Sequence, residues 1–265
     1  MKISLLIEGK GIYMTLLEEY IKQNNWRQWE RYLERLPLDK NQIVYDLGCS
    51  IGKVSKLLST KVSKVVGFDN NRYLLEEANR EKQDNCNFAL ADISKLNPSA
   101  LEKYDGIWFS FALAYMENPN LFIRKWTNYL NTGGWFAIVD IDGLFSKHLS
   151  VDSKYFNQIK KFENESEKGG NYDFKIGSKI KKLMEENGLK VIVEEIDWYD
   201  KELNFKGKGS SEIIENWKAR LERMVRLKEY LGENYTEFCR VFIESISEEN
   251  HVSNECVQFY VGIKS

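Results

Sequence analysis

The stretch that decides the fold reads Val44-Tyr45-Asp46-Leu47-Gly48-Cys49-Ser50-Ile51-Gly52. The apolar run 42–47 is typical of a buried strand, and the two glycines predict a sharp turn into a helix that begins near Lys53. An acid at the end of a strand, followed by a glycine turn, indicates a ligand site at the carboxyl edge of a sheet. Taken alone, the segment is also compatible with a purely structural strand–turn–helix corner.

The spacing of the glycines separates this turn from a phosphate-binding loop. Dinucleotide-binding turns read G-x-G-x-x-G, whereas here the spacing is Gly48-x-x-x-Gly52. Asp46 would repel a pyrophosphate but attract a cationic ligand. The turn therefore favours a positively charged ligand over a nucleotide phosphate.

Two further acids stand where the next two predicted strands end. Asp69 follows the strand expected over 62–68, and Asp92 follows the strand expected over 86–90. Asp69 comes 69 − 48 = 21 residues after Gly48, the separation at which such folds place a carboxylate on ribose hydroxyls. A simple turn residue is the alternative for Asp69. Three acids are thus expected along one edge of the sheet.

Strands alternate with helices along the chain, which favours parallel βαβ units and a doubly wound sheet. The remaining strands are expected over 104–111, 135–141, 190–198 and 255–263. Helices are expected over 16–36 (two, broken near Asn24), 53–60, 72–83, 121–130, 155–167, 177–187, 211–229 and 235–248. The last two helices form an insertion between the final two strands.

Composition excludes several classes of protein. The 265 residues carry 38 basic and 40 acidic side chains, a net charge of −2, so binding dominated by phosphate contacts is not expected. With 43% hydrophobic residues and three prolines, the chain predicts a folded domain rather than disorder. The four cysteines lack CxxC spacing, so no metal site is predicted and the thiols are expected to be reduced. With no apolar span of membrane length and no signal peptide expected, the predicted location is cytoplasmic.

Together, Asp46-Leu47-Gly48-Cys49-Ser50-Ile51-Gly52, Asp69 and Ala91-Asp92 resemble motifs I to III of the class I S-adenosylmethionine-dependent methyltransferases. Asn131-Thr132-Gly133-Gly134-Trp135 and the strand order are also similar, whereas Ser50 stands where the family most often has a third glycine. The resemblance implies an α/β, Rossmann-like, seven-stranded, mostly parallel sheet with helices on both faces and an antiparallel last strand. It also implies one domain over 1–265: a helical cover (1–40), a cofactor-binding half (41–142), and the remaining sheet (143–265) with a helical insertion at about 205–250.

S-adenosylmethionine is the cofactor that the resemblance implies, and its binding residues carry over by position. The methionyl part would contact Asp46, Gly48, Cys49, Ser50 and Gly52. Asp69 would hold the ribose hydroxyls, with Asn70 beside the adenine. Asp92 would meet the adenine amino group, and Ile93 would pack on the ring. The transferred methyl would lie near Phe109 and Ser110.

The sequence defines the residues that contact the methyl acceptor less closely than those that contact the cofactor. Methyl transfer from a sulfonium is an in-line displacement, and a hydroxyl acceptor needs a base. His148 follows the fifth strand and is predicted as a base or hydrogen-bond partner, with a loop histidine as the alternative; His251, in a polar turn, is expected to have no role. Asp142 is a second catalytic candidate. Either Asp142 or Asp140 could orient an amine or simply cap a turn.

Tyr13 and Tyr115 are predicted acceptor contacts, with core packing as the alternative for each. The mildly basic stretch 206–228 is interpreted as a solvated helix face rather than a nucleic-acid surface. The fourth strand lacks the Asn/Asp-Pro-Pro-aromatic signature of nucleobase-amine methylation. The favoured hypothesis is N- or O-methylation of a small-molecule or short peptide-like acceptor, with no nucleic-acid or membrane partner and the oligomeric state open. The alternatives are a non-catalytic cofactor-binding or regulatory relative and, less favoured, a nucleotide-dependent oxidoreductase.

Overall fold

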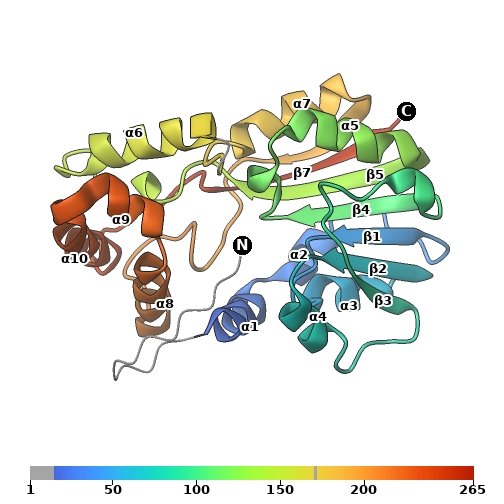
Figure 1. The fold of residues 1–265 in the computed structure, drawn as a ribbon, viewed down its shortest axis with the longest axis horizontal. Helices are drawn as coiled ribbons and strands as arrows, with labels where there is room; N and C mark the ends of the chain where they lie inside the picture. The colour runs from blue at the N-terminus through green and yellow to red at the C-terminus, as the bar shows by residue number, and fades with distance from the viewer. Residues whose placement is uncertain (1–14, 170–171) are drawn as a thin grey trace.

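A seven-stranded sheet forms the core of the computed structural model, which describes residues 15–169 and 172–265. The strands run in the order β3-β2-β1-β4-β5-β7-β6 (Figure 1). β7 is antiparallel to both of its neighbours, and the other pairs are parallel. The predicted sheet is therefore confirmed, including its antiparallel last strand. The strands span β1 (Ile43–Leu47), β2 (Lys64–Asp69), β3 (Cys86–Leu90), β4 (Tyr104–Ser110), β5 (Leu130–Ile141), β6 (Leu189–Glu195) and β7 (Val257–Lys264).

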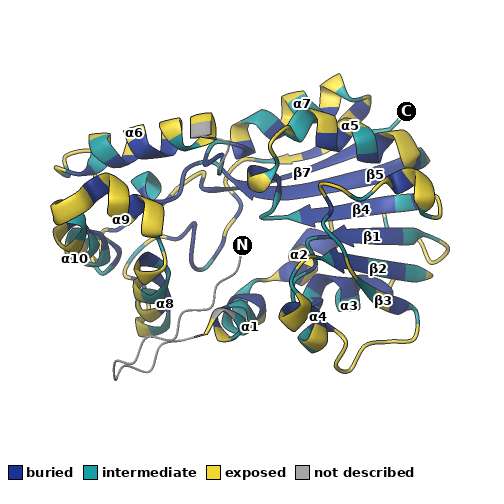
Figure 2. Ribbon diagram, viewed as in Figure 1, coloured by how far each residue is buried: buried dark blue, intermediate teal, exposed yellow. Residues whose placement is uncertain are grey.

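Helices cover both faces of the sheet. They span α1 (Leu16–Trp26), α2 (Trp29–Leu33), α3 (Lys53–Ser59), α4 (Arg72–Ala78), α5 (Pro119–Tyr129), α6 (Phe156–Ser166), α7 (Ile180–Glu186), α8 (Ser211–Glu222), α9 (Val225–Leu231) and α10 (Tyr235–Ile246). α2 and α3 pack on one face, and α5 and α7 pack on the other. Figure 2 shows buried strands between helices whose outward sides are exposed.

Strand β4 illustrates why the strand sequences are apolar without alternation. Trp108 packs edge-on against Trp29 and Tyr32 on the α2 side of the sheet. Phe109, the next residue, stacks on Phe122 of α5 on the opposite side, with ring centroids 4.9 Å apart. Since both faces of a central parallel strand are covered, successive residues are all buried.

The helices α8, α9 and α10 connect β6 to β7, and with α6 they form a cap beside the carboxyl ends of the parallel strands (Figure 1). Its interior is aromatic, with Phe145 of the β5–α6 connection in contact with Trp217 and Phe242. The single helix predicted over 211–229 is wrong, because the helical hydrogen bonding breaks at Met224, which has φ −81° and ψ 65°. No helix within 15–169 or 172–265 is long and apolar enough to cross a membrane.

Candidate functional site

The turn after β1 takes a conformation that glycine favours. Gly48, Ser50 and Gly52 have φ of +75°, +50° and +72°, all in the left-handed region. The amide of Gly48 donates to the carbonyl of Phe68 at 2.8 Å, which fixes the turn to the end of β2. A Cβ on Gly52 would lie 2.4 Å from the ring of Phe88, so this position has no room for a side chain.

Two acids converge on this turn. Asp46 is buried and accepts a hydrogen bond from the Ser55 hydroxyl at 2.5 Å. Burial raises the pKa of this carboxyl to about 7, and the charge of Asp69 adds to the shift. Asp69 accepts from the amides of Ser50 and Asn71, each at 2.8 Å, and burial raises its pKa above the usual value. The turn thus lies between two carboxyl groups whose negative charge is poorly solvated.

These residues fit S-adenosylmethionine, whose sulfonium and ammonium groups are cations. The Ser50 hydroxyl is buried and has no hydrogen-bond partner among the described residues. Asp46 has only a neutral partner in that part of the chain, so a cationic ligand would compensate its charge. Each oxygen of Asp69 accepts one amide and retains a lone pair for a ribose hydroxyl.

The other predicted cofactor residues of motif I to III are placed around this turn. Asn70 is exposed directly after β2, whereas Cys49 is buried and its sulfur would lie 2.8 Å from a Cβ on Gly67. The backbone of Cys49 is engaged as well, because its amide donates to Phe68 at 3.0 Å and its carbonyl accepts from Gly52 at 2.8 Å. Asp92 accepts hydrogen bonds from Ser94, which lower its pKa, while Ile93 is buried on the α5 side of the sheet.

The two residues predicted near the transferred methyl differ in placement. The place of Phe109 near the transferred methyl stays a prediction, while its side chain is enclosed, 0% exposed in its stack on Phe122. The cause is strand alternation, which turns this ring to the α5 face. Ser110 is half-buried, and its hydroxyl accepts from the indole of Trp108 at 3.2 Å.

Phe111, directly after β4, was not singled out from the sequence. It has φ +52°, a strained conformation for a bulky residue, and its amide donates to Val139 at 2.7 Å. The guanidinium of Arg27 lies over its ring, 4.2 Å from the centroid. The α1–α2 segment is therefore held against the end of β4, and no local pattern in the sequence indicates this contact.

Three tyrosines, which we call the tyrosine cluster, gather beside the site: Tyr20, Tyr115 and Tyr172. The rings of Tyr115 and Tyr172 meet edge to face at 4.7 Å. Burial raises the pKa of Tyr20 in α1 to about 12, and the charges of Tyr115 and Asp69 add to the shift. Tyr115 is 65% exposed and so accessible to a ligand. Tyr13, the other predicted acceptor contact, lies outside the described residues. Within the cluster, Tyr115 was predicted from the sequence, whereas Tyr20 and Tyr172 were not.

Asp140 and Asp142 end β5 in different settings. Asp140 is fully buried and accepts from the backbone amides of 113–114 at 2.9 and 3.3 Å; burial raises its pKa to about 7. It thereby fixes the segment that carries Tyr115. Asp142 is half-buried, and one of its carboxylate oxygens accepts from the amide of Ser178 at 3.3 Å.

His148 is enclosed rather than accessible from solvent. It is 1% exposed inside the cap, packed against Trp217 and Phe242. Its Nδ1 lies 3.2 Å from Nε2 of His251, and the two rings are parallel to within 6°. Burial lowers the pKa of both histidines. His148, predicted as a base or hydrogen-bond partner of the acceptor with a loop histidine as the alternative, is thus enclosed in the cap. His251, expected to have no functional role, packs against it.

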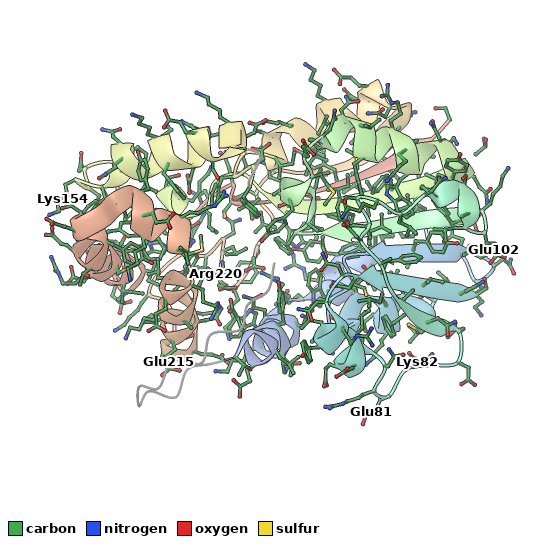
Figure 3. All side chains as sticks on the ribbon, in the orientation of Figure 1. Glu81, Lys82, Glu102, Lys154, Glu215 and Arg220 are labelled. Carbon is green, nitrogen blue, oxygen red and sulfur yellow. The ribbon has the colours of Figure 1, made fainter. Side chains whose placement is uncertain are left out.

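A set of charges, largely buried except for the exposed Arg223 and called here the α1–cap network, joins the N-terminal helix to the cap. Its members are Glu19, Arg27, Asp200, Glu202, Arg220 and Arg223. Arg220 extends from α8 toward the sheet (Figure 3), with Nη2 2.8 Å from Glu202 and Nε 3.8 Å from Glu19. Arg27 pairs with Asp200 at 2.8 Å. For Arg220, the interpretation of 206–228 as a solvated face is therefore wrong.

Comparison with known proteins agrees with these observations. The model of a methyltransferase-domain family matches residues 38–188. A methyltransferase of Streptomyces halstedii, GfsG, is 33% identical over 122 residues, 43% of each chain. A trans-aconitate 2-methyltransferase of Variovorax paradoxus is 33% identical over 114 residues, 42% of this chain and 43% of its own. The chain thus aligns with less than half the length of these curated relatives.

The fold is similar to solved methyltransferase structures over more of the chain than the sequence alignments cover. A phosphoethanolamine N-methyltransferase of Haemonchus contortus, solved with phosphomonomethylethanolamine and S-adenosylhomocysteine, superposes with a TM-score of 0.54 at 19% identity. That match covers 90% of this chain and 52% of the other. The family match spans more than half of the chain and includes the glycine turn and all three acids. The chain therefore belongs to the methyltransferase-domain family, within the class I S-adenosylmethionine-dependent methyltransferases.

Proposed function

We propose that this protein transfers a methyl group from S-adenosylmethionine to nitrogen or oxygen of a small-molecule or short peptide-like acceptor. The observation that carries the proposal is the convergence of Asp46 and Asp69 on the left-handed glycine turn. The relative from Variovorax paradoxus, whose name gives a small carboxylic acid as its substrate, supports the small-molecule class.

The cofactor side depends on charge and shape. Asp46 compensates the cationic methionyl end, the turn brings bare backbone against it, and Asp69 accepts from the ribose hydroxyls. When bound, the sulfonium supplies an electrophilic methyl group and a neutral thioether as leaving group. The chain's task is then to align the acceptor atom with that methyl and to keep water out.

The acceptor side depends on the end of β5 and the segment after β4. Asp140 holds the backbone amides that precede Tyr115, which fixes the direction of that exposed ring. Asp142 retains one carboxylate oxygen without a described partner, and that oxygen can accept a proton from an ammonium or hydroxyl acceptor. His148 is left out of this role because its side chain is enclosed by the cap.

Titration calorimetry with S-adenosylmethionine tests the cofactor assignment. We expect Asp69→Asn to weaken binding by about tenfold or more, because one acceptor oxygen becomes an NH2 donor and the other loses its charge. Asp84→Asn, an exposed acid on the loop before β3, is the matched control and should bind like the wild type. Absence of wild-type binding, or equal affinity in the two variants, would refute the proposal.

Incubation with a metabolite extract and isotope-labelled cofactor tests the chemistry. Mass spectrometry should detect a labelled methylated product together with S-adenosylhomocysteine. Cofactor binding without product or cofactor turnover would instead identify a non-catalytic relative.

A further inference from the structure

We infer that the acceptor carries an anionic oxygen group, a carboxylate or a phosphate, which Arg220 and the tyrosine cluster bind. The inference rests on the proposed methyl transfer and adds the chemical class of the acceptor. It follows from the hydrogen-bonding groups that this part of the structure leaves available.

Arg220 brings a partly available cation to the site. Its Nη2 and Nε face Glu202 and Glu19, and Nη1 has no acidic partner within the described chain. The guanidinium stacks on Trp217, 4.7 Å from the ring centroid, which fixes its plane. A fixed guanidinium with an open edge is well suited to a carboxylate or phosphate.

The tyrosine cluster adds donors beside this cation. The hydroxyls of Tyr45 and Tyr104 donate to backbone carbonyls, whereas those of the tyrosine cluster form no hydrogen bond with any described residue. Burial raises the pKa of each cluster member, so all three hydroxyls are donors at neutral pH. Nε of Arg220 lies 3.8 Å from Glu19, the residue before Tyr20, so the cation lies beside the α1 end of the cluster. These hydroxyls can therefore donate to an oxyanion near Arg220.

Four acids around the site each have at least one partner. Asp140 accepts from backbone amides, and Asp69 does the same at the turn. Glu202 is bound by Arg220 and by the amide of Asn216, while Glu19 is bound by Arg223. Among the described side chains, the groups left to bind the acceptor beside α8 are Nη1 of Arg220 and the tyrosine hydroxyls, which are donors and favour an anionic group. The oxygen of Asp142 without a described partner lies at the end of β5 and is assigned to the reacting atom of the acceptor.

The test measures binding of citrate, inorganic phosphate and tetramethylammonium to the protein saturated with S-adenosylhomocysteine. In the double variant Arg220→Met/Glu202→Gln both charges of the pair are removed, so no buried charge is left alone and the net charge is unchanged. We expect its affinity for the anionic probe to fall about tenfold or more, as for the loss of a charge-assisted bond. Tyr115→Phe should weaken the same probe about threefold.

Arg226→Met is the matched control, because this exposed arginine of α9 has no ion pair in the described structure. It should bind the anionic probe like the wild type. Preference for citrate would indicate a carboxylate acceptor, and preference for phosphate a phosphorylated one. Equal anion affinity in the wild type and the double variant, no anion binding, or tighter binding of tetramethylammonium would overturn the inference. S-adenosylhomocysteine affinity, measured in parallel, reports separately on the proposed function.

Discussion

Removal of the central charge of the α1–cap network should destabilise the protein measurably. Glu202 is 0% exposed and lies 2.8 Å from Arg220, 3.8 Å from Arg27 and 2.5 Å from the Asn216 amide. Glu202→Gln keeps the shape and removes the charge. Breaking one partner of a buried ion pair costs about 3–5 kcal/mol. We expect about 3 kcal/mol, because Arg27 keeps Asp200 and Arg220 keeps Glu19.

Urea unfolding and thermal melting measure this loss. A change of about 3 kcal/mol should lower the Tm by about 6–12 °C in a domain of this size. Glu212→Gln is the matched control, since its pair with Lys201 at 3.4 Å is exposed and worth about 0–1 kcal/mol. Arg220→Met/Glu202→Gln should recover part of the loss, because it leaves no lone charge. A Glu202→Gln variant as stable as the Glu212 control would refute the reasoning.

Three further predictions follow from other parts of the site. The folded-state pKa of Asp46 is raised above its usual 3.8 to about 7, so the folded protein binds this proton more tightly than the unfolded chain. The unfolding free energy should therefore fall as pH rises from about 4 to 7. Asp46→Asn should flatten this slope in urea titrations at several pH values. Gly52→Ala should destabilise by more than about 1 kcal/mol in the same assay and weaken cofactor binding, because the left-handed turn is strained by a Cβ and Phe88 must shift. Glu163 accepts from three amides of 144–146, so Glu163→Ala should cost about 3 kcal/mol and Glu163→Gln about 1–2 kcal/mol on thermal melting.

Most of the sheet was predictable because its signals are local. Apolar runs mark buried strands, and Gly48 and Gly52 mark a turn that only small residues allow. The break near Met224 was not predictable, since the apolar spacing of 211–229 continues through it. There Arg223 pairs with Glu19 of α1, a contact between segments about 200 residues apart in the chain.

The cofactor side of the site was easier to predict than the acceptor side for the same reason. Asp46 and Asp69 lie in motifs whose spacing reports their place in the sheet. Tyr20 and Arg220 come from a cover helix and a cap helix, and nothing in their local sequence indicates that these two helices meet through Glu19 and Arg220. His148 was a candidate because it follows the fifth strand on the edge expected to face the cofactor, yet its ring pairs with His251, 103 residues away in the chain.

The position of β7 has a consequence for synthesis of the protein. This strand lies between β5 and β6, yet it leaves the ribosome only after all the cap helices. Until then β6 has no strand partner, and one side of β5 lacks its neighbour. The nascent chain therefore presents an unpaired, apolar sheet edge for the time needed to translate about 60 residues, a state prone to aggregation. We expect chaperone demand during translation to be greatest in this interval.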